Sequence, residues 1–113
     1  MPKRGDVYLA RLDSKERSEQ AGARSVVVVS RDSINQNSPV VIVVPVTDRS
    51  HKKRLYPSQV VLKAGGGGLS IDSIALAEQV RAISTTRLIK HLGNLTPQSV
   101  TQIGAALKIA LDL

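Results

Sequence analysis

The sequence contains no cysteine, phenylalanine or tryptophan, and its aromatic side chains other than histidine are Tyr8 and Tyr56. Without cysteine, a disulfide framework and a thiolate metal site are excluded, and a reducing cytosol fits. With so few aromatic rings, we do not expect the base-stacking platform that many single-strand-binding domains use. If this chain binds RNA, hydrogen bonds and phosphate contacts have to supply most of the recognition.

Long apolar runs are also missing. No segment approaches the roughly 18 apolar residues that suggest a membrane-spanning helix, and Met1–Asp6 has no hydrophobic signal region. We therefore expect a soluble protein of the cytoplasm. At 113 residues, the chain is most simply one domain, residues 1–113, large enough for a hydrophobic core without disulfides.

Acidic residues are fewer than basic residues. Sixteen Lys and Arg residues against nine Asp and Glu leave a net charge of +7. A surplus of this size on a small domain attracts polyanions at long range, so a nucleic-acid partner is the leading interpretation. A basic protein with no specific partner is the alternative, because charge informs on association and not on fold.

Valine dominates two segments, residues 24–30 and 40–46, and each reads as a buried strand because β-branched residues pack well on a pleated sheet. We expect further strands at residues 5–12, 58–63 and 73–83, and a flexible glycine-rich connector at 64–68. Helical signals predict one turn after Asp32, a short helix at 85–92 capped by Ser84, and a last helix opened by Thr96-Pro97. This pattern predicts an α+β fold, a small curled antiparallel sheet with helices packed at one end.

Two polar side chains bound the valine strands. Arg24 stands at the start of the first strand and Thr47 at the end of the second. Arginine suits phosphate binding, and a hydroxyl can donate to the same group, so the pair suggests phosphate chemistry. The alternatives are an ion pair of Arg24 with Glu19 or Asp48, and an ordinary turn-capping role for Thr47.

Several segments together resemble a known family. They are Arg4–Tyr8, the loop Ser18-Glu19-Gln20-Ala21-Gly22-x-Arg24, the strand end Val46-Thr47, and Asp72–Ile83. In colinear order over residues 3 to 90, they resemble the MazF/PemK (Kid) toxins, the mRNA interferases of type II toxin–antitoxin systems. The family usually has proline directly after the arginine, where this sequence has Ser25.

The resemblance implies an SH3-like β-barrel of about five to seven strands with short helices and a C-terminal helix, assembled as a homodimer. It implies a sequence-specific endoribonuclease that cuts single-stranded mRNA without metal or other cofactor, leaving a 5′-hydroxyl and a cyclic or 3′-phosphate. Arg24 and Thr47 match the residues that the family ties to cleavage. An acidic, MazE-like antitoxin would neutralise the toxin, in keeping with the positive charge.

Further residues are candidates for RNA binding. The first loop carries mixed donors and acceptors that suit base edges, unless it is simply solvated: Ser18, Glu19 and Gln20. Four basic residues suit backbone phosphates, or an acidic partner: Arg17, Lys52, Lys53 and Arg54. Glu78 and Gln79 are candidates for the groove floor, with structural hydrogen bonding as the alternative.

Other chemistries have weaker support. His51 titrates near neutrality, but it lies in a basic loop where an exposed, solvated histidine is the commoner outcome. His91 is expected at the end of a short helix, without a catalytic role. No histidines or carboxylates are spaced as metal ligands, so we expect no metal site. Two alternative functions stay open, a CcdB-like gyrase poison of the same fold and a non-catalytic RNA-binding module.

Overall fold

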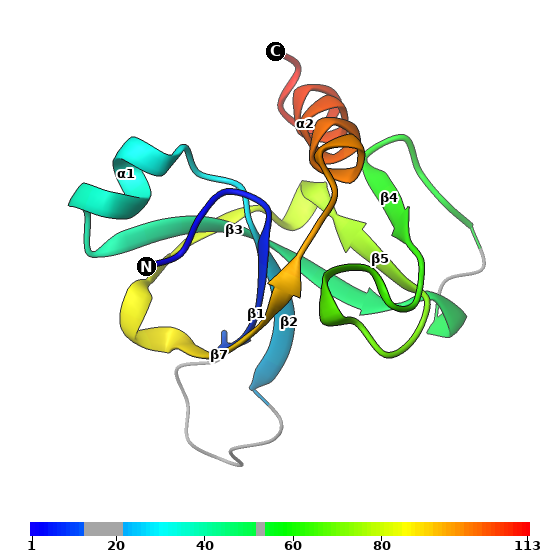
Figure 1. Ribbon diagram of the computed structural model, residues 1–113. Coiled ribbons are helices and arrows are strands. Elements are labelled where there is room, and N and C mark those ends of the chain that lie inside the picture. Colours follow the sequence, from blue (N-terminus) through cyan, green and yellow to red (C-terminus); the bar gives the residue numbers. More distant parts are fainter. Residues whose placement is uncertain (13–21, 52–53) are drawn as a thin grey trace.

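The computed structural model describes residues 1–12, 22–51 and 54–113. They form one seven-stranded sheet with two α-helices and four short 3-10 turns (Figure 1). The strands are β1 (Asp6–Arg11), β2 (Ala23–Val28), β3 (Val40–Asp48), β4 (Gln59–Leu62), β5 (Ser73–Leu76), β6 (Arg81–Ser84) and β7 (Leu88–Asn94). The helices are α1 (Asp32–Asn37) and α2 (Pro97–Leu111), and the turns are η1 (Arg49–His51), η2 (Gly66–Gly68), η3 (Ala77–Gln79) and η4 (Thr85–Arg87).

The strand order is β4-β5-β3-β2-β1-β7, and β6 pairs with β3 beside β5. Every pairing is antiparallel. No ladder among the described strands joins β6 to β7, so the sheet curls back without closing. The predicted α+β class and C-terminal helix are thus confirmed, while the word barrel applies only loosely.

The valine strands bury both of their faces, as their composition predicts. On one face, Val27, Val44 and Val46 pack with Ile103 of α2. On the opposite face, Val26 and Val28 belong to a second cluster that includes Val41, Val43 and Ile83. A strand enclosed on both sides needs apolar residues at every position, and this explains the unbroken runs of valine.

β3 is central and changes partner along its length. Val40 to Val43 pair with β6, whereas Val46 to Asp48 pair with β5. Pro45 falls between these two ladders and is fully buried. Proline cannot donate to a ladder, so it sits where the partner strand changes. Pro45 therefore marks the change of partner on one side of β3, while on the other side it is paired with Val26 of β2.

α2 covers one end of the sheet next to β4 (Figure 1). The Thr96 side chain accepts a hydrogen bond from the Ser99 backbone N–H at 3.2 Å, and Pro97 occupies the first helical turn, as predicted. Ile103 and Ala106 are buried against the sheet, while Leu111 is half-exposed. No helix among the described residues is long and apolar enough to cross a membrane.

Two predicted elements are wrong. The strand expected at 73–83 is split by η3 into β5 and β6, because the chain turns from one half of β3 to the other. The helix expected at 85–92 is the turn η4 followed by β7, which pairs with β1. Ser84 does cap a helical turn, since its hydroxyl accepts from the Thr86 N–H, but that turn ends at Arg87.

The glycine-rich segment is also not a flexible connector. Its turn η2 packs against β7, and an added Cβ on Gly68 would lie 2.0 Å from the Leu92 carbonyl oxygen. Glycine is needed there because only a residue without a side chain permits this close approach at φ +77°. The segment thus anchors the edge strand β7 to the core.

Candidate active site

The structure brings Arg24 and Thr47 to the same place. The β2–β3 ladder runs from the Val28–Val43 pair to the Val26–Pro45 pair, and Arg24 and Thr47 each lie two residues beyond its end. The Arg24 Nη2 donates to the Val46 carbonyl oxygen at 3.5 Å, one residue before Thr47. The Arg24 guanidinium therefore lies beside the end of β3 that carries Thr47.

Both side chains stand where the buried sheet meets solvent. Arg24 and Thr47 are partly buried, in contrast to the fully buried valines beside them. Among the described residues, the single ion pair is His91 with Asp6, so Arg24 forms none with Asp48. Glu19, the other predicted partner, lies outside the described residues. The Arg24 guanidinium thus contacts a neutral carbonyl, and no carboxylate among the described residues pairs with it.

The turn that follows Thr47 is held by Asp48. One Asp48 carboxylate oxygen accepts from the Ser50 backbone N–H at 2.8 Å. This hydrogen bond, helped by the Ser50 hydroxyl and by the nearby His51, lowers the pKa of Asp48 below its ordinary value, although some desolvation opposes the shift. The Arg49 N–H donates to the Asp72 carbonyl oxygen at 3.0 Å, which ties the same turn to the residue before β5. Thr47 therefore belongs to a firmly connected strand end.

Glu78 lies in η3 and is exposed. Its Oε1 accepts from the Ser58 hydroxyl and its Oε2 from the Gln59 side-chain amide, each at 2.8 Å. The alternative of structural hydrogen bonding is therefore real for Glu78. Sequence reasoning missed Ser58 and Gln59, because nothing in the local pattern indicates that the start of β4 meets η3.

The other predicted residues divide into two groups. Gln79 and Arg54 are exposed, and so is His51 in η1. Six predicted RNA-binding residues lie outside the described residues, and their role stays a prediction: Arg17, Ser18, Glu19, Gln20, Lys52 and Lys53.

His91 is placed differently from expectation. It lies on β7, where its Nε2 is 3.6 Å from an Asp6 carboxylate oxygen and its ring centroid is 5.0 Å from that of Tyr8. Burial, with the Asp6 charge adding to it, raises the pKa of Tyr8. His91 thus belongs to a surface cluster on β1 and β7 and does not adjoin β3. Within residues 1–12, 22–51 and 54–113, no three histidine or carboxylate side chains gather as they would around a metal ion.

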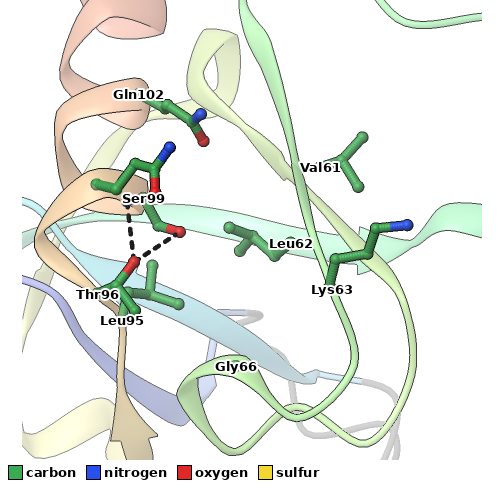
Figure 2. A pocket seen from close by; sticks show the side chains of 9 residues that line it. Val61, Leu62, Lys63, Gly66, Leu95, Thr96, Ser99 and Gln102 are labelled. Carbon is green, nitrogen blue, oxygen red and sulfur yellow. Dashed lines mark hydrogen bonds between the residues drawn. The ribbon is translucent and has the colours of Figure 1, made fainter.

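A pocket between β4, η2 and the start of α2 does not coincide with the Arg24–Thr47 pair. Figure 2 shows its lining, in which Ser99 and Gln102 of α2 face Leu62 and Lys63 across the opening. Thr96 at its base is engaged in capping α2. None of the predicted site residues lines this pocket.

The fold and the composition define a small basic α+β protein in which an arginine and a threonine lie near the ends of two neighbouring strands. The family model described as PemK-like, MazF-like toxin of type II toxin-antitoxin system matches residues 3–111. This chain therefore belongs to that toxin family, as the resemblance in its sequence predicted. Membership in this family excludes the CcdB-like alternative.

Comparisons with individual proteins agree with this family assignment. Endoribonuclease MazF9 of Mycobacterium tuberculosis is 40% identical over 118 residues, which cover 100% of this chain and 98% of that protein. Endoribonuclease MazF of Staphylococcus saprophyticus is 38% identical over 113 residues, covering 100% and 93%. Among solved structures, an endoribonuclease in complex with its cognate antitoxin from a mycobacterial species has a TM-score of 0.82 at 26% identity, covering 100% of this chain and 97% of that one.

Proposed function

We propose that this protein, as a single toxin domain over residues 1–113, is a sequence-specific endoribonuclease that cuts single-stranded mRNA and thereby arrests translation. The observation that supports the proposal is the Arg24 guanidinium at 3.5 Å from the Val46 carbonyl oxygen, directly before Thr47. The names of the full-length relatives support the activity.

The proposed reaction is an internal transfer of the phosphodiester. The ribose 2′-hydroxyl gives up its proton as its oxygen forms a bond to phosphorus, the bond from phosphorus to the 5′-oxygen breaks, and the leaving oxygen takes up a proton, so the proton count is unchanged. The products are a 2′,3′-cyclic phosphate, which water can open to a 3′-phosphate, and a 5′-hydroxyl. Arg24 stabilises the negative charge that builds on the non-bridging oxygens, and Thr47 donates to the same phosphate and fixes its orientation. Because a guanidinium supplies the positive charge, the reaction proceeds without metal.

The same proposal implies two kinds of binding partner, an RNA strand and an acidic antitoxin. A net charge of +7 suits both an RNA strand and an acidic antitoxin, and the structural relative solved with its cognate antitoxin supports the second. Arg54 and the basic residues near it contact RNA phosphates, whereas residues 18–20, Glu78 and Gln79 face bases. We place the toxin in the cytoplasm, where mRNA is available, and propose a homodimer as its active form.

The test is cleavage of a mixed RNA pool in the presence of a chelator, with sequencing of the 5′-hydroxyl ends. Removing one donor aimed at the developing charge costs on the order of 10²- to 10³-fold in rate. We expect losses of that size for Arg24→Ala and Thr47→Ala, with RNA binding largely retained. Matched controls are Arg31→Ala and Thr101→Ala, which alter exposed residues on the α1 cap and on α2.

Two results would contradict the proposal. If the protein binds the pool without cutting it, the non-catalytic RNA-binding module is correct. If Arg24→Ala cuts as fast as its Arg31→Ala control, the nuclease site lies elsewhere on the molecule.

A further inference from the structure

β4 lies at one edge of the sheet. Its residues Gln59 to Leu62 pair with β5 on one side, and no described strand pairs with them on the other side. In the described part of the chain, the backbone groups along this outer edge therefore have no partner strand. Such an edge can accept an extended segment of another chain as an additional strand.

The start of α2 forms the opposite wall of a groove beside this edge. The pocket between them has a volume of about 330 Å³ and is lined by the end of β4, by η2 and by the first turns of α2. Leu62 and Leu95, which are 3% and 8% exposed, form its apolar part. In Figure 2, Leu62 lies on the side of β4 that faces α2, whereas Val61 and Lys63 point to the other side. The two sides of the edge therefore differ in chemistry.

Lys63 supplies the charge at this groove. It is exposed, and within residues 1–12, 22–51 and 54–113 it forms no ion pair. No Asp or Glu residue lines the pocket. The Asp72 carboxylate accepts a hydrogen bond from the Ala64 N–H at 2.8 Å and does not pair with Lys63. On a protein with a net charge of +7, this groove is complementary to an acidic segment.

We propose that the groove binds an extended, acidic peptide segment of a partner protein, which adds to β4 as a further strand. Successive side chains of a strand point to opposite faces. A segment in which apolar and acidic residues alternate therefore places its apolar side chains beside Leu62, facing α2, and its acidic side chains beside Lys63. None of the predicted cleavage or RNA-binding residues lines the groove, so this inference does not depend on the proposed nuclease function.

The probe is a library of capped nine-residue peptides in which valine or leucine alternates with aspartate or glutamate. Peptides selected against the whole protein are titrated into isotope-labelled protein and followed by NMR. We expect the largest shifts of backbone amide signals at residues 59–63 and 95–102. Methylating the peptide nitrogens that face β4 removes their hydrogen bonds, so one alternate set of methylated nitrogens should weaken binding by at least about tenfold, and the other set should have little effect.

Two pairs of variants test the contacts within the groove. Lys63→Glu places a like charge beside the acidic peptide, and its control Lys90→Glu makes the same change at an exposed position of β7. Gln102→Trp fills the mouth of the groove, and its control Ile109→Trp enlarges an exposed side chain farther along α2. We expect each groove variant to bind the peptide at least about tenfold more weakly, with melting temperatures and control affinities close to those of the wild type.

Three results would overturn the inference. The first is a selection that yields no peptide with a Kd below about 1 mM. The second is equal binding of the two sets of methylated peptides, because a strand added to β4 uses only one of its edges. The third is that a short single-stranded RNA shifts the signals of residues 59–63 as the peptide does, because the groove would then attract any polyanion.

Discussion

Gly68 provides a sharp test of the fold, because the sequence alone suggested a flexible connector where the structure has a close contact. Its backbone has φ +77°, and a Cβ added there would lie 2.0 Å from the Leu92 carbonyl oxygen and 2.6 Å from the Leu92 carbonyl carbon. Both partners are backbone atoms of β7, so a side-chain rotation cannot relieve the clash. We therefore expect Gly68→Ala to push β7 away from the turn η2.

The expected loss in the free energy of unfolding of Gly68→Ala has two parts. A left-handed conformation costs a residue with a Cβ about 1–2 kcal/mol, and overpacking that moves backbone costs about 1–3 kcal/mol. Together they predict that Gly68→Ala lowers the free energy of unfolding by about 2 to 5 kcal/mol. For a domain of this size the smaller value corresponds to a melting temperature lower by about 8 °C or more.

Two neighbouring glycines allow the two parts to be measured separately by urea and thermal denaturation. Gly65 also has a positive φ, at +94°, but open space around an added Cβ, so Gly65→Ala reports conformational strain alone. Gly66 has open space and no positive φ, so Gly66→Ala should be neutral or stabilise by up to about 1 kcal/mol. If Gly68→Ala is no less stable than Gly65→Ala, the close approach to Leu92 is wrong. If all three match the wild type, the flexible-connector interpretation is restored.

Two further predictions concern stability. Ile103 is 1% exposed between α2 and the sheet, so Ile103→Ala should lower the free energy of unfolding by about 2–5 kcal/mol in urea denaturation. The control is Ile109→Ala, at a position that is 56% exposed. Equal losses for the two variants would refute the packing of α2 against the sheet. The pKa of Asp32 lies below its ordinary 3.8, chiefly because the Arg4 backbone N–H donates to its carboxylate and then because the Asn35 amide does, with desolvation opposing. The stabilising contribution of Asp32 is therefore present at a pH above its ordinary pKa and is lost as the pH falls through its lower pKa in the folded protein. We expect Asp32→Asn to reduce the decrease of the urea unfolding midpoint between about pH 5 and pH 3. An unchanged decrease would refute this assignment.

Local patterns in the sequence predicted those features that depend on a residue and its close neighbours. The valine runs identified β2 and β3 because enclosure on both faces requires apolar residues throughout. Thr96 followed by Pro97 located the start of α2 because capping needs only the first turn of the helix. The net charge of +7 follows from the composition and does not depend on the fold. The motif around Arg24 pointed to the toxin family, which the full-length matches establish.

Features that depend on a distant partner were not predictable in this way. The cap at Ser84 predicted a helix over residues 85–92, yet residues 88–94 form β7 because they pair along the edge of β1. Only the pairing of β2 with β3 brings Arg24 beside the strand end that carries Thr47, 23 positions away in the sequence.

The sequence by itself therefore determined the residue types at the site, the two central strands, the last helix and the attraction to polyanions. The tertiary structure decided which strands pair, where the glycines permit close approach, and that Ser58 and Gln59 orient Glu78. The physical reason is that propensity and capping act over a few neighbouring residues, whereas strand pairing and side-chain contact depend on segments that only folding brings together.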